Sequence, residues 1–288
     1  MIDIILPTGA MGNIVAGYIS QLMGLPIRRL VAAVNINDIM YQTINYGTFH
    51  KSPRMERTLS EAINIQVPYN FERMIYYITN ENDVLVKEYY ESLETTNQIT
   101  IPEEYLQKIQ TIFQSARVTD TQMCDAIRYI YDTYNHYMID PHTAVAFSAA
   151  IQLQYIHQQR QCLFPDSSPD ESKPPLSTKQ HDDCSTPSTT STVILATASP
   201  CKFEHSVSTA VGRTTWDTYM QSEAYPERAK RILSMQLDTA SSNNNNNNEN
   251  HIHHYTNPNC LPISEVQKEW EEQTRKLIHA LERKREIE

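Results

Sequence analysis

The chain has 288 residues, 40% of them hydrophobic, which is enough for one large domain or two small ones. Its 34 acidic side chains outnumber its 24 basic ones, the net charge is −10, and lysine and arginine are not clustered. Because nucleic-acid binding needs basic clusters, the composition argues against nucleic acid as a partner.

The five cysteines are odd in number and show no Cys-x-x-Cys spacing. This pattern favours free thiols in a reducing compartment and indicates neither a disulfide framework nor a zinc site. We therefore expect a cytoplasmic protein without a bound metal.

A short apolar run over residues 2–6 predicts a strand that is buried on both faces. Apolar residues then recur at helical spacing, with Asn13 as the expected N-cap and Gly24 as the helix stop. Residues 28–35 predict a second strand. This order is a βαβ unit, and we therefore expect a parallel sheet.

Residues 4–27 carry no charge and could be taken for a membrane span. The segment contains a proline and several glycines, and Asp3 rather than a basic region precedes it. We interpret it as buried structure and expect no membrane contact.

The rest of the chain is predicted to be mainly helical, with one more strand. Expected helices cover residues 38–47, 70–79, 83–93, 102–115, 120–134, 140–159, 223–237 and 264–287. Asp140 followed by Pro141 is a typical helix start. Residues 192–198 predict the additional strand.

Two stretches differ in composition from the rest. Residues 162–192 are rich in Ser, Thr, Pro and Asp, and residues 239–263 form an Asn- and His-rich linker. Such segments do not support a packed core, so we predict that both are disordered. The predicted organisation is a domain over residues 1–161 that resumes at 193–238, followed by a C-terminal helix over 264–288.

The stretch PTGAMGN, residues 7–13, lies between the first strand and the first helix. A glycine-rich turn there leaves the first backbone amides of the helix free to bind an anion, above all phosphate. Thr8 and Asn13 are side-chain candidates for the same ligand. The spacing fits neither the P-loop nor the dinucleotide pattern, so a tight turn that binds nothing remains the alternative.

Polar segments follow three of the predicted strands, namely PTGAMGN, VNIND and LATASPCKF. Because parallel strands end at the same edge of a sheet, the three segments could line one crevice. Each by itself could equally be an ordinary cap or turn.

Five blocks of the sequence, in the same order, resemble the C-terminal half of threonine synthases and most closely the threonine synthase-like phospholyases. The blocks are PTGAMGNIVAGYISQLMGLPI, VNINDIM, TLSEAINIQVPYNFERM, DPHTAV and ILATASPCKF. They run from Pro7 to about Phe203, and no clear resemblance follows Val207. The resemblance implies an α/β fold of the tryptophan-synthase-β type, here a partial parallel-sheet domain with helical segments and disordered inserts.

The resemblance also implies pyridoxal 5'-phosphate as the cofactor. The residues that would hold its phosphate are Thr8, Gly9, Ala10, Met11, Gly12 and Asn13. Thr197 would place a hydroxyl near the pyridine nitrogen, and a neutral hydroxyl does not keep that nitrogen protonated. Typical members have Asn-Phe in place of Ala10-Met11 and His in place of Ser199.

Four further residues are candidates for substrate binding. Asn35, Asn37 and Asp38 match a substrate-side block by position. Arg73 could face the substrate's phosphate or form a salt bridge on a helix surface. His142 is expected in the first turn of a helix, with or without a functional role.

Members of this family bind the cofactor through a Schiff-base lysine in a Phe-Lys-Asp context, in a half that precedes the glycine loop. Lys51, Lys87 and Lys108, the lysines before the first insert, do not have that context. We therefore assign no catalytic residue and expect the isolated chain to be inactive. It could be a truncated gene model, a half that needs a partner such as a missing N-terminal half, or a relic.

The activity implied by the resemblance is that of a pyridoxal-phosphate-dependent lyase of threonine biosynthesis. It would convert O-phosphohomoserine and water to threonine and phosphate, with a small phosphorylated amino acid as substrate. One alternative is a related phospholyase that releases a keto acid and ammonia. Another is a non-catalytic protein that binds phosphorylated small molecules.

Overall fold

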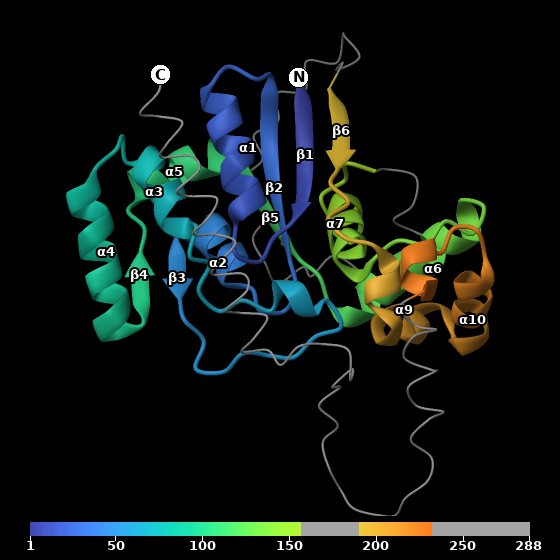
Figure 1. Cartoon of the computed structure of the whole chain (residues 1–288). Helices are drawn as coiled ribbons and strands as arrows, with labels where there is room; N and C mark the ends of the chain where they lie inside the picture. Colours follow the sequence, from blue (N-terminus) through green and yellow to red (C-terminus); the bar gives the residue numbers. More distant parts are fainter. Residues whose placement is uncertain (157–189, 232–288) are drawn as a thin grey trace, which may run out of the picture. The chain divides into compact units, whose positions relative to one another are not determined.

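The computed structural model describes residues 1–156 and 190–231. Met1–Tyr225 form one compact unit around a four-stranded parallel sheet with the strand order β5-β2-β1-β6 (Figure 1). The strands are β1 (Ile2–Pro7), β2 (Ile27–Val34), β5 (Phe113–Arg117) and β6 (Ser191–Ile194). This sheet with its surrounding helices confirms the predicted α/β class.

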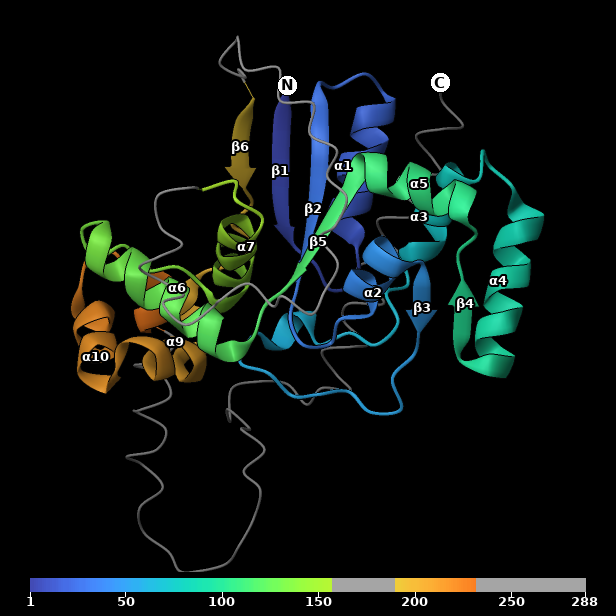
Figure 2. The ribbon, with the colours of Figure 1, turned by 180° about the vertical axis from the view of Figure 1, so that it is seen from behind.

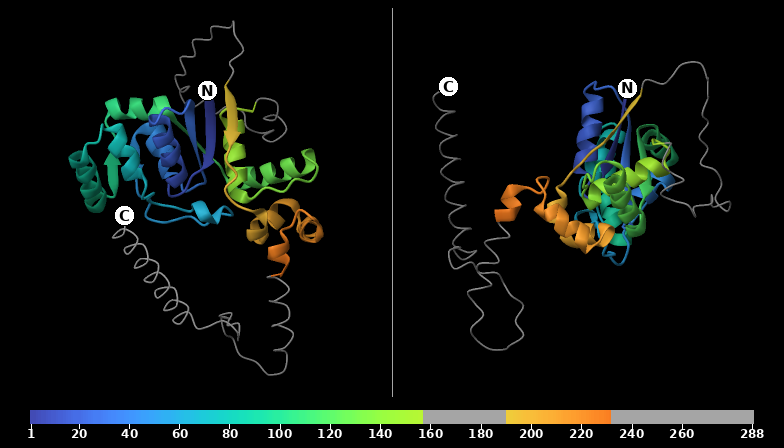
Figure 3. Two further views of the ribbon diagram at one scale, coloured as in Figure 1. Left: turned by 45° about the horizontal axis from the view of Figure 1, so that its top comes forward. Right: turned by 90° about the vertical axis from the view of Figure 1, so that its right-hand side faces the viewer.

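The predicted βαβ unit is formed by β1, helix α1 (Gly12–Leu22) and β2. Leu30 of β2 packs beneath α1, where a Cβ atom added at Gly17 would lie 2.8 Å from the Leu30 Cδ2. Val31 is equally buried but points to the opposite face of the strand. Helix α7 (Pro141–Gln152) covers that second face, so the sheet lies between α1 and α7 (Figure 3).

Two groups of smaller elements flank the sheet, one on each side (Figures 1 and 2). The first contains α2 (Ile39–Tyr46), α3 (Phe71–Ile78), α4 (Asp83–Thr96), α5 (Glu103–Ile112) and the antiparallel pair β3 (Thr48–His50) and β4 (Gln98–Thr100). The second contains α6 (Asp120–Thr133), α9 (Glu204–Val211) and α10 (Arg213–Gln221). Two 3-10 turns, η1 (Glu61–Ile63) and η3 (Pro200–Lys202), lie in the connections.

Several predicted boundaries were wrong. Helix α1 begins at Gly12, so Asn13 is not its N-cap, and Met11 takes that position with a left-handed φ of 67°. The helix predicted over 102–115 ends at Ile112, because Phe113 begins strand β5 and pairs with Leu30 of β2. A helical pattern does not reveal this pairing, since it depends on a partner strand far away in the sequence.

The remaining predictions fall partly outside the described residues. The helix predicted from residue 223 begins at residue 227, after Pro226, and only 227–231 of it are described. Most of the insert over 162–192, the linker over 239–263 and the helix over 264–288 lie outside the described ranges. These boundaries therefore stay predictions.

The uncharged segment over residues 4–27 forms most of β1, all of α1 and the start of β2. Within residues 1–156 and 190–231, no helix is long and apolar enough to cross a membrane.

Candidate functional site

A cavity of about 280 Å³ lies where β1 and β6 end. All seven residues predicted to hold the cofactor line it, namely Thr8, Gly9, Ala10, Met11, Gly12, Asn13 and Thr197. The opposite wall includes Ala62, Ile63, His142 and Phe203. The segments PTGAMGN and LATASPCKF, which are far apart in the chain, thus meet at one edge of the sheet.

The glycine loop, residues 7–13, leads directly into α1. The first hydrogen bond of the helix runs from the Val15 amide to the Met11 carbonyl at 3.0 Å. The amides of Gly12, Asn13 and Ile14 therefore have no acceptor within the helix. These amides and the positive end of the helix dipole lie at the cavity wall, and this combination suits a phosphate group.

Because Gly12 has no side chain, its backbone is accessible from the cavity. A Cβ atom added there would meet only the Asn70 Nδ2, at 3.6 Å, so the backbone is open on its remaining sides. The Met11 side chain is buried in the core and does not fill this space. A ligand can therefore approach the backbone closely at Gly12.

Asn70 supports the glycine loop from α3, and sequence reasoning missed this role. It occupies the predicted N-cap position, but its side chain makes no cap hydrogen bond. Its Nδ2 instead donates to the Ala10 carbonyl at 2.8 Å. Asparagine is common at helix starts, so this contact could not be recognised before the chain was folded.

The three polar side chains of the predicted cofactor site differ in what they can offer a ligand. The Thr8 hydroxyl donates to the Leu6 carbonyl at 2.9 Å, so it can only accept a further hydrogen bond. Asn13 and Thr197 are exposed, and their side chains make no hydrogen bond to another described residue. Asn13 and Thr197 are therefore the side chains available to donate into the cavity.

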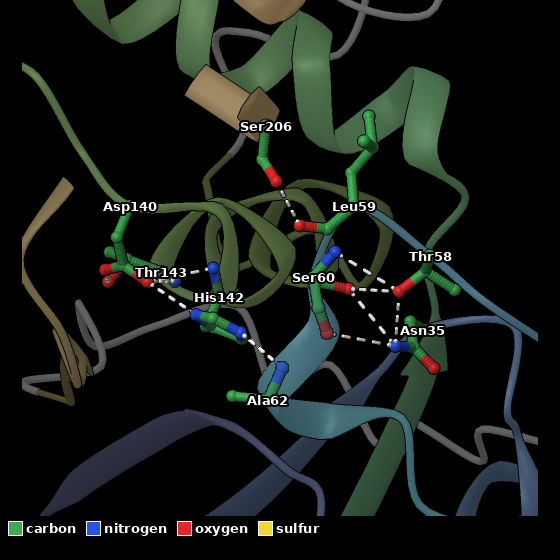
Figure 4. A network of polar contacts seen from close by, with 9 residues as sticks. All are labelled: Asn35, Thr58, Leu59, Ser60, Ala62, Asp140, His142, Thr143 and Ser206. Atoms are coloured by element: carbon green, nitrogen blue, oxygen red, sulfur yellow. Dashed lines mark hydrogen bonds and ion pairs between the residues drawn. The ribbon is translucent and has the colours of Figure 1, made fainter. Parts of the chain in front are cut away.

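His142 lies at the N-terminus of α7 and is 2% exposed (Figure 4). Its Nε2 accepts a hydrogen bond from the Ala62 amide at 3.1 Å, and its Nδ1 lies 2.9 Å from the Asp140 Oδ1. Since an amide can only donate, Nε2 carries no proton and the Nδ1–H donates to the carboxylate. The imidazole also contacts the Phe203 ring in a T-shaped arrangement, with 4.7 Å between the ring centroids.

Asp140 caps α7 by accepting from the amides of His142 and Thr143, at 2.9 and 3.3 Å. The Thr143 hydroxyl donates to its second oxygen. Burial by itself would raise the pKa of this carboxyl, but the hydrogen bonds from His142 and Thr143 outweigh it and lower the pKa. Asp140 is therefore an anion that fixes the orientation of the imidazole.

The residues predicted for substrate binding do not line this cavity. Asn35 is 1% exposed and donates to the Thr58 hydroxyl at 3.0 Å and to the Asn64 Oδ1 at 2.7 Å. Asn37 and Asp38 line a second cavity of about 440 Å³. Asp38 also forms an ion pair with Arg117 at 3.2 Å.

Segment 58–64 accounts for this separation, since it contacts Asn35 and also provides Ala62 and Ile63 of the first cavity. The VNIND block therefore does not reach the crevice formed by the other two segments. Arg73 is exposed on α3 and lines neither of these two cavities. The roles of Asn35, Asn37, Asp38 and Arg73 stay predictions.

The cavity fits one end of pyridoxal phosphate clearly. The glycine loop, with amides that have no acceptor within α1, suits the phosphate, and Thr197 lines the same space. The described cavity residues include no lysine that could bind the aldehyde end. In the described ranges, no group of three or more His, Cys, Asp or Glu side chains could hold a metal ion.

Comparison with known families and proteins gives matches to threonine synthases and threonine synthase-like proteins. The family model described as "Threonine synthase, C-terminal" matches residues 177–253. The expected end of the resemblance near Val207 was therefore too early. Human threonine synthase-like 2 is 38% identical over 171 residues, which cover 58% of this chain and 35% of the human protein. Threonine synthase of Eremothecium gossypii is 30% identical over 243 residues, which cover 80% of this chain and 42% of that enzyme.

Two solved structures have a similar fold. Threonine synthase from Brucella melitensis, described as bound to pyridoxal phosphate, matches with a TM-score of 0.58 and 26% identity over 74% of this chain and 38% of that one. Yeast threonine synthase matches with a TM-score of 0.65 and 24% identity over 84% of this chain and 47% of that one. In each of these four comparisons the chain spans less than half of the relative's length.

Proposed function

We propose that the chain belongs to the threonine synthase family and that its glycine-loop cavity binds pyridoxal 5'-phosphate. The observation that carries this proposal is the meeting of the unpaired amides at the start of α1 with Thr197 around one cavity. The identity to threonine synthases over more than half of the chain supports the same cofactor.

The proposed roles follow from the contacts of each residue. The amides of Gly12, Asn13 and Ile14 bind the phosphate, and the Asn13 side chain adds a donor. Thr197 offers its hydroxyl to the pyridine nitrogen. When bound, the cofactor supplies an electron sink for a carbanion on the substrate.

We propose that the family reaction is the loss of phosphate from O-phosphohomoserine and the addition of water to give threonine. The runner-up is elimination that releases a keto acid and ammonia. Both need a Schiff-base lysine, and the described cavity residues provide none. Activity therefore depends on a lysine from outside these residues.

A Gly12→Asp substitution tests the cofactor site. The added side chain fits sterically, because only the Asn70 Nδ2 lies near the new Cβ. Its carboxylate would repel the phosphate, and we expect pyridoxal phosphate binding to weaken at least about a hundredfold. Equilibrium dialysis measures the affinity. Ala16→Asp is the control, since it adds the same charge to an exposed position of α1 outside the cavity lining. Equal affinity of the two variants would exclude the glycine loop as the phosphate site.

A second candidate function is favoured by the lack of a lysine among the described cavity residues. In that case the chain binds a phosphorylated small molecule without chemistry. Threonine formation assayed with the chain alone and with cell extract separates the two candidates. Product with the chain alone, or above the amount that the same extract forms without the chain, supports the enzyme, whereas cofactor binding without such product supports the binding protein.

A further inference from the structure

Segment 58–64 forms a wall of the cavity that packs directly on the glycine loop. A Cβ atom added at Gly9 would lie 3.0 Å from the Ile63 Cα, so the two backbones are in close contact. Any displacement of η1, which contains Ile63, therefore changes the space beside the glycine loop.

Most of this wall is fixed by buried polar contacts (Figure 4). Asn35 donates to Thr58 and also to the Ser60 hydroxyl, at 3.1 Å. The Leu59 carbonyl accepts from the Ser206 hydroxyl at 2.6 Å. These contacts hold the N-terminal half of the wall to β2 and α9.

The Ala62 amide has a different partner. It lies in the first turn of η1, where amides have no acceptor within the turn, and the N-cap residue Ser60 makes no side-chain cap bond. The acceptor is the His142 Nε2, 80 residues further along the chain. His142 thus replaces the missing cap of η1.

The same imidazole also contacts Phe203, a further cavity residue, which lies six residues after Thr197. Its other nitrogen is held by Asp140, which belongs to the cap of α7. One buried ring therefore connects α7, the wall and the segment that carries Thr197.

We propose that His142 is a positioning residue, which in its neutral Nδ1–H form holds η1 and Phe203 in the arrangement that the cofactor phosphate needs. The proposal rests on the proposed function only for the identity of the ligand. The contact that positions η1 is the hydrogen bond from the Ala62 amide to the His142 Nε2. Asp140 is the charged group that faces the ring and selects this tautomer.

Two substitutions in the full chain separate positioning from simple filling of space. In His142→Gln the side-chain oxygen can reach the place of Nε2 and still accept from Ala62. In His142→Asn the shorter side chain can pair with Asp140 but does not reach Ala62. His205→Asn is the matched control, because His205 is exposed on α9.

We expect His142→Asn to weaken pyridoxal phosphate binding about tenfold and to speed hydrogen exchange of the Ala62 amide at least about tenfold. His142→Gln is expected to keep both values within about threefold of the unmodified chain. If the unmodified chain and all three variants bind pyridoxal phosphate with equal affinity, the inference is wrong and the proposed function is unaffected.

Nitrogen-15 NMR of the unmodified chain gives a test that needs neither ligand nor variant. The inference requires the Nδ1–H tautomer of His142, and an Nε2–H tautomer would overturn it. Absence of pyridoxal phosphate binding by the unmodified chain would contradict the proposed function, while the tautomer and the Ala62 exchange would still decide the role of His142.

Discussion

Individual buried polar side chains hold the segments around the cavity together. Asn35, Asn70 and Asp140 are each at most 6% exposed. Asn35 and Asn70 donate to backbone atoms of other segments, whereas Asp140 accepts from the first turn of the helix that it caps. Such groups are costly to bury unless they are paired, so their partners are strongly specified. The shape of the cavity therefore depends on a few buried hydrogen bonds, one of which is accepted by the charged carboxylate of Asp140.

Asp140→Asn tests the strongest of these networks. The NH₂ group of the new asparagine side chain cannot accept a hydrogen bond from the Thr143 hydroxyl, and the negative charge that orients His142 is lost. We expect the free energy of unfolding at about pH 7 to fall by about 2 kcal/mol. Urea denaturation measures it. Asp132→Asn, at an exposed position of α6, should change it by less than about 0.5 kcal/mol.

The effect of Asp140 should depend on pH. Because the hydrogen bonds lower the pKa of its carboxyl in the folded chain, this stabilisation is complete above the unfolded value of about 3.9. It is lost as the pH falls through the lower, folded value. Urea denaturation of both proteins from about pH 7 down to about pH 3 should therefore show the difference between Asp140→Asn and the unmodified chain shrinking in acid. A constant difference would mean that the charge of Asp140 does not stabilise the fold.

The short helices after β6 depend on packing for their stability. Helices α9 and α10 have only 8 and 9 residues, too few to be stable alone in water. Trp216 of α10 is fully buried, and its ring lies 5.5 Å from that of Tyr219 and 6.1 Å from that of Tyr225 between centroids. This aromatic cluster anchors α10.

Trp216→Ala should therefore destabilise the chain by about 3–5 kcal/mol, since it removes a large side chain from a closely packed cluster. Thermal unfolding followed by near-ultraviolet circular dichroism reports both stability and the aromatic packing. Tyr137→Ala removes an aromatic ring that is 63% exposed and should have little effect. A small effect of Trp216→Ala would mean that α10 is held by other contacts.

Across the molecule as a whole, the sheet is covered on both faces but has an exposed end. Strand β6 pairs with β1, and no other described strand lies beyond it. Its residue Val193 is 44% exposed, and Ser191 and Thr192 before it are exposed as well. Exposed apolar edge strands favour association with other chains.

We expect Val193→Lys to reduce self-association without changing the fold, because a lysine on an edge strand disfavours strand pairing. Sedimentation velocity at several concentrations measures the association, and far-ultraviolet circular dichroism checks the fold. Val84→Lys makes the same exchange at an exposed position of α4. An equal effect of both substitutions would show that net charge, rather than the strand edge, controls association.

The βαβ unit, the parallel sheet and the position of the glycine loop could be predicted from the order of the residues alone. These features depend on contacts that are local in the chain, namely apolar periodicity and the turn between β1 and α1. The resemblance to threonine synthases likewise could be recognised from five short blocks, and Thr197 does line the same cavity as the glycine loop.

Which polar residues reach that cavity depends on how distant segments pack in the folded chain. Asn37 follows its strand as Gly9 does, but segment 58–64 turns it toward a second cavity, while His142 is brought in from α7. Strand β5 could not be predicted for the same reason, because Phe113 becomes part of a strand only through its pairing with Leu30. Pairings between residues 80 or more positions apart leave no periodic pattern in the sequence, so they appear only when the chain is folded.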